Sequence, residues 1–209
     1  MLGAVFGDKY SWEDYGSIMN YARITPPVPK TNYVDIAGGN SALDLTEALG
    51  GIVYEDGDIE FKFTLFSLSD LSKMKNDIHG KRGKIVLQRE ADYYYDGRTT
   101  CTKQVQEGRI YELYFTARVY PYKYERFESV YVESVTGQDK EVILQNASMP
   151  VMPKIKVDGN IYLIFEGVRY SMGMGEYQHP DIILQEGDNR IRLSGNGTVK
   201  FIYRKGRLI

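Results

Sequence analysis

The alternation of apolar and polar residues from position 59 to position 65 predicts a half-buried β-strand. Its two faces separate by residue type, with Ile59, Phe61, Phe63 and Leu65 on one and Glu60, Lys62 and Thr64 on the other. Successive side chains of a strand point to opposite faces, so the apolar set is expected to pack in a core while the polar set meets water. Residues 84–89 and 111–119 are also expected to form strands.

A different period follows and predicts one amphipathic helix over residues of about 68–79. Its apolar residues fall at spacings of three, three and four: Leu68, Leu71, Met74 and Ile78. Residues at these spacings share one face of a helix. Ser67 and Asp70 are placed as a capping box, and Gly80 follows the expected end. The helix is therefore expected to pack on the sheet through this apolar face.

Beyond residue 126 the sequence changes to short apolar stretches that are cut by turn residues. Strands are expected over residues 129–135, 141–145, 154–157, 161–165, 181–185, 190–193 and 198–203. Segments such as Asp158-Gly159-Asn160 and Gly195-Asn196-Gly197 are expected to be turns between them, because glycine and asparagine supply positive φ at low cost. The expected fold class is mainly β with one helix. Residues 1–126 form an N-terminal β-sheet or barrel-like domain with the packed helix, and residues 127–209 form a small antiparallel β-sandwich.

The charge balance argues against binding to polyanions. The chain has 26 Lys and Arg residues and 28 Asp and Glu residues, a net charge of -2, which gives no long-range field toward nucleic acid or anionic lipid. No apolar run approaches the ~20 residues that cross a bilayer, so membrane insertion is not expected. A single cysteine, Cys101, and a start without a basic flank favour synthesis in the cytoplasm. The 18 tyrosines beside one tryptophan favour β structure and assembly.

Candidate catalytic chemistry is sparse. Cys101 has no histidine nearby in the sequence, and the two histidines, His79 and His179, lie far apart along the chain. A nucleophile needs an adjacent base, and a metal site needs clustered ligands. The chain is therefore not expected to be an enzyme, and no catalytic, cofactor-binding or metal-binding residue is predicted. The acidic turn at residues 55–58 lacks the ligand spacing of a calcium loop and is expected to be solvated.

Seven short segments occur in the same order as the motifs of a known family. They are residues 34–40 (Val-Asp-Ile-Ala-Gly-Gly-Asn), 43–47 (Leu-Asp-Leu-Thr-Glu), 91–98 (Ala-Asp-Tyr-Tyr-Tyr-Asp-Gly-Arg, expected as a turn), 120–123 (Tyr-Pro-Tyr-Lys), 183–191 (Ile-Leu-Gln-Glu-Gly-Asp-Asn-Arg-Ile), 195–199 (Gly-Asn-Gly-Thr-Val) and 203–208 (Tyr-Arg-Lys-Gly-Arg-Leu). Together they resemble the short form of the distal tail protein (Dit) family of long-tailed bacteriophages. Each motif alone is common among β proteins, so the order and spacing over nearly the whole chain carry the resemblance.

The resemblance implies a structural protein of the phage tail tip, located in the virion after assembly in the host cytoplasm. It implies that the N-terminal domain closes a homo-hexameric ring around a channel for DNA. One face of the ring is then expected to meet the tail-tube protein, and the other the tail-associated protein or fibre. The C-terminal domain is expected to be a galectin-like β-sandwich that projects outward.

A second hypothesis is a carbohydrate-binding module that contacts the bacterial surface. A β-sandwich can stack a sugar ring on an exposed aromatic side chain, and the candidate contacts are Tyr162, Tyr170 and Tyr177. The only tryptophan, Trp12, lies in the other expected domain, and strand tyrosines are more often core or interface residues. Both hypotheses stay open, and the ring protein is favoured.

Overall fold

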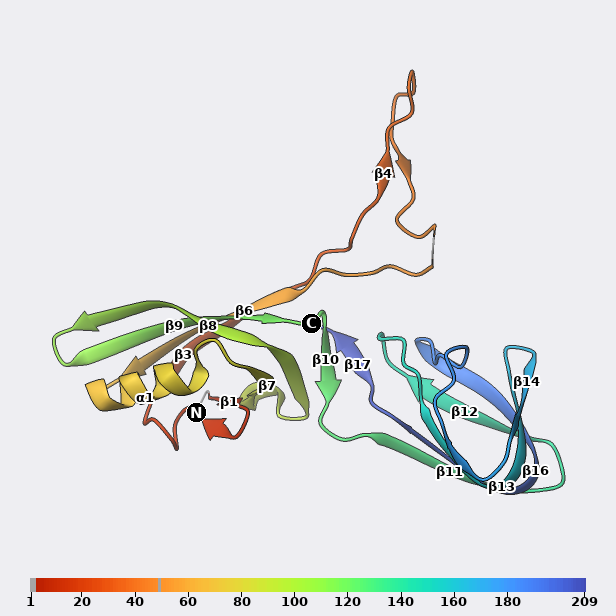
Figure 1. Cartoon of the computed structure of the whole chain (residues 1–209). Coiled ribbons are helices and arrows are strands. Elements are labelled where there is room, and N and C mark those ends of the chain that lie inside the picture. The colour runs from red at the N-terminus through yellow and green to blue at the C-terminus, as the bar shows by residue number, and fades with distance from the viewer. Residues whose placement is uncertain (1–2, 49) are drawn as a thin grey trace. The chain divides into compact units, whose positions relative to one another are not determined.

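The structure is a computed structural model that describes residues 3–48 and 50–209 (Figure 1). The chain divides into two compact units, Met1–Lys123 with Leu208–Ile209, and Tyr124–Arg207. The first unit thus ends at Lys123, before the expected boundary after residue 126, and includes the last two residues of the chain. Two strands, β10 (Tyr122–Glu125) and β17 (Gly206–Leu208), span the two points where the chain passes between the units.

An antiparallel sheet forms the body of the first unit. Its main path runs in the order β2-β1-β7-β8-β9-β6-β3. The bounds are β1 Ala4–Phe6, β2 Lys9–Tyr10, β3 Ile18–Thr25, β6 Gly57–Leu65, β7 Arg82–Leu87, β8 Tyr93–Glu107 and β9 Ile110–Val119. The predicted strands at 59–65 and 111–119 are confirmed, and so is the mainly β class with one α-helix, for the residues that the structure describes.

Two expectations for this sheet were wrong. The strand predicted over residues 84–89 ends at Leu87, because Gln88–Glu90 forms a 3-10 turn. Residues 91–98, expected as a turn, instead lead into the long strand β8 from Tyr93 onward. The inward positions of β8 include Gly97 and Thr99, so this strand has no regular apolar alternation that a pattern could detect.

The register of the central strands brings their apolar faces together. Three residues of β6 lie opposite three of β9, namely Ile59, Phe61 and Phe63 against Ala117, Phe115 and Leu113. Directly opposed residues point to the same face of a sheet, and all six are almost fully buried. The ring of Phe6 on β1 meets that of Phe61 edge to face, with the centroids 5.3 Å apart. This aromatic cluster is the centre of the first core.

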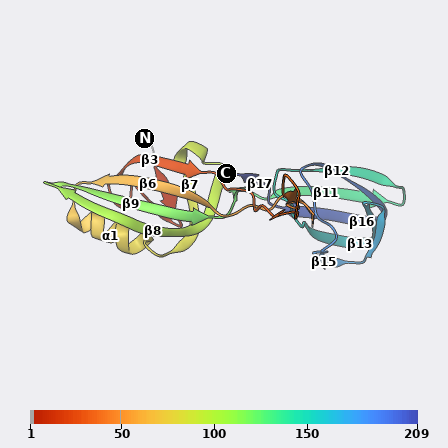
Figure 2. The ribbon, with the colours of Figure 1, turned by 90° about the horizontal axis from the view of Figure 1, so that it is seen from above.

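Helix α1 (Leu68–Ile78) covers one face of the first sheet (Figure 2) and confirms the predicted helix. The Ser67 hydroxyl caps it by accepting a hydrogen bond from the backbone N–H of Asp70 at 3.4 Å. The residues that it buries against the sheet are Leu71, Met74 and Ile78. Leu68, expected on the same face, is exposed, because at about 3.6 residues per turn it lies at the margin of the apolar stripe.

Residues 26–56, which we call the arm, connect β3 to β6 without joining the sheet of the first unit (Figure 1). The arm forms its own two-stranded sheet from β4 (Tyr33–Val34) and β5 (Leu43–Asp44). Nearer its base, backbone hydrogen bonds join Lys30 to Val53 at 2.8 Å and Glu55 to Val28 at 2.9 Å. Every residue from 28 to 43 is nevertheless exposed, so the arm has local backbone order but almost no core of its own.

A six-stranded antiparallel sheet makes up the second unit. Its order is β11-β16-β13-β14, with β12 paired to β16 and β15 paired to β13. The bounds are β11 Ser129–Thr136, β12 Lys140–Asn146, β13 Lys154–Phe165, β14 Val168–Met172, β15 Gly175–Tyr177 and β16 Gly187–Tyr203. The predicted strands at 129–135 and 141–145 are confirmed. The prediction missed β14 and β15.

Glycines bend the two long strands of this sheet around its core. Gly159 has φ +118° and lies opposite Gly197, which has φ +150°. A Cβ on Gly159 would lie 2.3 Å from the carbonyl oxygen of Asn196, so only glycine fits there. The same alternate positions are buried before and after the bend, for example Val157 and Ile161 of β13. The sheet therefore curves with one continuous face toward the core, in the manner of a sandwich.

Five of the predicted strands in this unit are not separate strands, because of these bends and a proline. The stretches 154–157 and 161–165 are one strand, β13, and 190–193 and 198–203 are one strand, β16. Glycine was interpreted as a turn signal, but here it bends a strand whose ladder continues. The strand expected over 181–185 is reduced to a single bridge between Leu184 and Val151, since a turn at His179-Pro180 precedes it.

Candidate functional site

The cysteine and a histidine approach each other, but not as a nucleophile and its base. The His79 Nδ1 atom accepts a hydrogen bond from the backbone N–H of Cys101 at 3.0 Å, so the ring is engaged by the main chain. Burial raises the pKa of the Cys101 thiol above its usual value. An activated cysteine needs the opposite shift, so this pair has the electrostatics of a structural contact.

The remaining histidine has a packing role in the second unit. The His179 ring lies edge to face with Tyr170, with 4.7 Å between centroids, and its Nδ1 accepts from the backbone N–H of Asp181 at 3.3 Å. Across the described residues, no group of three or more His, Cys, Asp or Glu side chains is placed to hold a metal ion. In the same part of the chain, no helix has the length and hydropathy to span a membrane.

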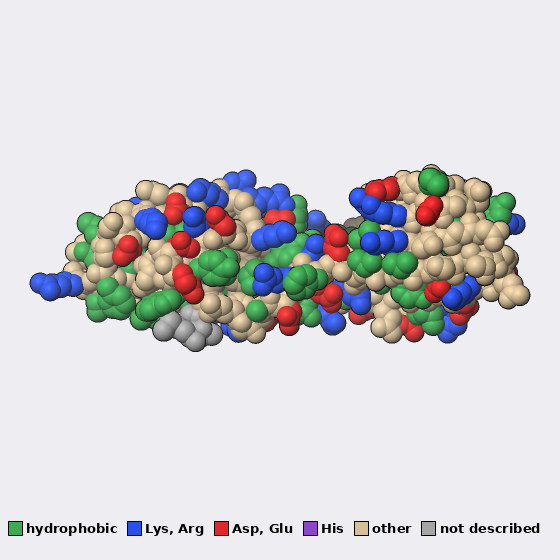
Figure 3. All heavy atoms as spheres, turned by 90° about the horizontal axis from the view of Figure 1, so that it is seen from below, with side chains coloured by type: hydrophobic (Ala, Val, Ile, Leu, Met, Phe, Trp, Pro, Cys, Tyr) green, Lys and Arg blue, Asp and Glu red, His purple; other side chains and the backbone are tan. Residues whose placement is uncertain are grey.

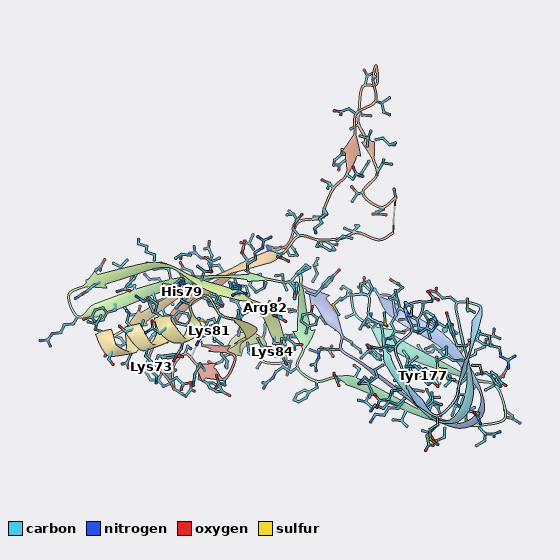
Figure 4. All side chains as sticks on the ribbon, in the orientation of Figure 1. Lys73, His79, Lys81, Arg82, Lys84 and Tyr177 are labelled. Atoms are coloured by element: carbon cyan, nitrogen blue, oxygen red, sulfur yellow. The ribbon has the colours of Figure 1, made fainter. Side chains whose placement is uncertain are left out.

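The three tyrosines proposed as sugar contacts do not share a face. Tyr162 lies on the outer side of β13, where the Arg169 guanidinium covers its ring at 4.0 Å from the centroid. Tyr170 lies opposite the buried Leu163, and Tyr177 opposite the buried Ile155. Paired residues point to the same side, so these two rings point inward, and the Tyr177 hydroxyl donates to the Gly173 carbonyl at 3.1 Å (Figure 4).

A row of arginines on the first unit was not predicted from the sequence. The register places Arg82 of β7 opposite Arg98 of β8, and Arg98 opposite Arg118 of β9. All three are exposed on the outer side of the sheet. The charged residues could be seen in the sequence, but only the strand pairing brings them together. Because arginine is enriched at protein interfaces, this row is a candidate interaction surface.

The arginine row borders a groove with a volume of about 400 Å³. Two carboxylates of the same chain lie in it. Arg118 Nε is 2.9 Å from Asp56 Oδ2, and Arg82 Nε is 3.1 Å from Asp96 Oδ1. The Arg82 guanidinium also lies 4.8 Å from the ring centroid of Tyr120. Hydrogen bonds to Tyr120 and to Asp96 raise the pKa of Arg82 above its usual value.

A second, smaller groove of about 170 Å³ lies beside β7. Apolar side chains of the core line it, namely Phe6, Ile78 and Ile85. Four basic side chains border it, Lys9, Lys81, Arg82 and Lys84, against two carboxylates: Asp8, which pairs with Lys9, and Asp77, which accepts from the Tyr15 hydroxyl. Figure 3 shows Lys and Arg side chains on the first unit, interspersed with Asp and Glu. Such a groove suits a ligand that is apolar and acidic at once.

Comparison with known proteins identifies the fold. No protein-family model and no curated protein sequence matches the chain. The crystal structure of the SPP1 Dit protein, described as a paradigm of the hub adsorption apparatus in phages that infect Gram-positive bacteria, matches with a TM-score of 0.68 at 12% sequence identity. The match covers 98% of this chain and 99% of SPP1 Dit. The resemblance that the sequence motifs predicted is thus confirmed at the level of the fold, and the chain has a Dit-like fold.

Proposed function

We propose that this chain is the structural hub of the tail tip of a long-tailed phage or prophage. The observation that carries the proposal is the likeness of fold over nearly the whole length to SPP1 Dit, a protein described as a hub of the adsorption apparatus. A shared fold does not by itself fix function. The surfaces of this chain add support, because they have the chemistry of interfaces rather than of an active site.

In the proposed assembly the first units of six copies form a ring. Repeated head-to-tail contacts close a ring when the rotation between neighbours returns to its start. Each contact must bury well over ~1,000 Å² to be stable. The first unit offers both the apolar side chains of the arm and the arginine row for such contacts. No cofactor or enzymatic step is part of this mechanism, since the binding free energy of the contacts between copies drives assembly.

The proposed ring has two faces and a channel. One face meets the tail-tube protein, the other meets the tail-associated protein or fibre, and DNA passes through the centre without specific binding. Assembly takes place in the host cytoplasm, and the finished protein stays in the virion. The second unit, a galectin-like sandwich in this proposal, lies outside the channel wall.

Negative-stain electron microscopy of the purified protein, together with mass photometry, tests the ring. Six-fold particles with a central hole and the mass of six copies are expected. If the protein stays monomeric at high concentration and also fails to assemble with the tube and fibre proteins of its own phage, the proposal is wrong. The sugar-binding alternative predicts a monomer that binds cell-wall glycans, so the same preparation separates the two hypotheses.

A further inference from the structure

We propose that the arm of one copy docks as an added strand beside β7 of a neighbouring copy. In this arrangement residues 33–36 of the arm occupy the 170 Å³ groove, with apolar side chains toward its floor and Asp35 toward its lysines. The inference rests on the proposed ring, because it names the contact between adjacent copies.

The arm has the composition of a segment that is buried in an assembly. Tyr33, Ile36 and Val53 are 61%, 54% and 58% exposed, although their side chains are wholly or mainly apolar. Clustered apolar exposure of this kind marks an interaction site. The arm is also acidic, with Lys30 as its only base against Asp35, Asp44, Glu47, Glu55 and Asp56. Its partner is therefore expected to be apolar and basic.

The groove beside β7 has this complementary chemistry. Phe6, Ile78 and Ile85 give it an apolar floor. Three basic residues labelled in Figure 4 lie along its rim: Lys81, between the end of α1 and β7, and Arg82 and Lys84 of β7. The Lys81 side chain is exposed and has no ionic partner among the described residues. An added carboxylate there would thus meet a free ammonium group.

The backbone of β7 is open on the same side. Strand β1 pairs with β7 only from Ile85 to Leu87, and Gly7 donates one further hydrogen bond to the carbonyl of Lys84 at 2.8 Å. Strand β8 occupies the opposite edge of β7 from Arg82 to Ile85. The edge at Arg82–Gly83 thus faces the groove with main-chain groups that an extended segment can pair with.

The alternation of the arm matches that of β7. In β7, Arg82 and Lys84 are exposed on one side of the strand, while the buried Ile85 and the exposed Gly83 share the other side. A Cβ on Gly83 would meet no atom within 4 Å, so space is open beside it. When residues 33–36 of the arm pair as an extended strand, Val34 and Ile36 share one side of it and Asp35 takes the other. An added strand can therefore place two apolar side chains inward and one carboxylate beside the lysines.

The groove over the arginine row is the less suitable partner for the arm. Two of its three arginines, Arg82 and Arg118, already contact carboxylates of their own chain, and the third, Arg98, donates to the backbone carbonyl of Gly80. An incoming carboxylate would compete with these groups, whereas Lys81 needs no exchange of partners. The charge distribution thus selects the groove beside β7.

Charge reversal with rescue tests the contact. Asp35→Lys in the arm, or Lys81→Glu with Lys84→Glu in the groove, is expected to weaken self-association about tenfold or more, because a like-charge pair replaces an attractive one. All three changes together are expected to restore assembly. Asp139→Lys and Arg109→Glu, at exposed turn positions, are the matched controls and are expected to leave assembly unchanged. Mass photometry gives the oligomer distribution, and far-UV circular dichroism checks that each variant is folded.

Crosslinking between differently tagged copies tests the location. One copy carries Ile36→Cys and the other Gly83→Cys, both with Cys101→Ser, so a short bismaleimide can join the two only between chains. A crosslinked heterodimer and rescue by the combined charge reversal are expected. Rings that form unchanged with Asp35→Lys would overturn this contact and leave the proposed ring intact. Lost assembly without rescue or crosslink, or capture of the arm by a tube or fibre protein instead, would also overturn it. A protein that never assembles and gives no crosslink would refute both proposals.

Discussion

Replacing Gly159 by alanine is expected to destabilise the second unit by about 2 to 4 kcal/mol. The residue has φ +118°, and a Cβ would lie 2.3 Å from a backbone carbonyl oxygen, that of Asn196. Holding a non-glycine residue in such a region costs about 1 to 3 kcal/mol, and the contact with the neighbouring strand adds the cost of a backbone shift, of about 1 kcal/mol or more. The reduced entropy of the unfolded chain offsets less than about 1 kcal/mol.

Two other glycines of the same unit separate the causes. Gly167 has φ +81° but open space around it, so Gly167→Ala is expected to cost about 1 to 2 kcal/mol from the backbone alone. Gly173 lacks a positive φ, and its nearest neighbour is 3.8 Å from the Cβ position. Gly173→Ala is therefore expected to change the free energy of unfolding by less than about 0.5 kcal/mol, or to raise it slightly.

Urea denaturation with two signals measures this series. Trp12, the only tryptophan, lies in the first unit, so its fluorescence follows that unit alone. Far-UV circular dichroism follows both units and contains the transition of the second. The midpoint of the Trp12 transition is expected to stay unchanged. The midpoint of the second unit's transition is expected to fall least for Gly173→Ala, more for Gly167→Ala and most for Gly159→Ala. Equal costs for Gly159→Ala and Gly167→Ala would refute the argument that close strand approach, and not only φ, requires glycine at the bend.

Three further predictions concern the core, an ion pair and the tyrosines. Phe63→Ala, which empties the centre of the first core, is expected to cost about 3 to 5 kcal/mol in the Trp12-monitored transition, and an unchanged midpoint would contradict the packing. Burial opposes ionisation of Glu90, but hydrogen bonds from Lys123 and Tyr95 outweigh it and lower its pKa below 4.5. The stability that ionised Glu90 contributes is present above its pKa in the unfolded chain and is lost as pH falls through its pKa in the folded protein. Lys123→Met is therefore expected to reduce the fall in the free energy of unfolding between about pH 5 and 3. An unchanged dependence of stability on pH in acid titrations would refute this account of Glu90. Tyr162→Ala, Tyr170→Ala and Tyr177→Ala are expected to leave the retention of the protein on host-wall glycans unchanged, since Tyr162 points outward while Tyr170 and Tyr177 point inward, and a specific loss with one of them would revive the sugar-binding hypothesis.

The parts of the fold that the sequence predicted are those in which one side is purely apolar. Strand β6 and helix α1 have such faces, so their periods were visible. Strand β8 was missed because Gly97 and Thr99 take inward positions where β7 and β9 come close. A Cβ on Gly97 would lie 2.2 Å from the Arg118 carbonyl oxygen. Small residues are required there, and they carry no hydropathy signal.

The candidate interaction surfaces were not predicted, because they depend on the folded structure and, for the arginine row, on strand pairing between residues far apart in the sequence. Arg82, Arg98 and Arg118 become neighbours only through the register of three strands. The apolar residues of the arm were interpreted as parts of family motifs, and nothing local distinguishes an exposed Ile36 from a buried one. Burial is a property of the completed fold, so the sequence pattern alone gives no measure of it.

This chain and SPP1 Dit share a fold at 12% sequence identity. The residues that select a binding partner are therefore expected on the surface and not in the cores. The curved sheets require apolar residues at alternate positions and glycine at a few bends, and many sequences satisfy both conditions. The proposed ring must, in addition, join copies of the same chain and reject similar chains, which requires matched charge and shape at each contact. The acidic arm and the lysine-rimmed groove beside β7 are elements that can change together while the cores stay intact. Exchanging only the arm between two related rings is therefore expected to block assembly, and exchanging the arm with its groove to restore it.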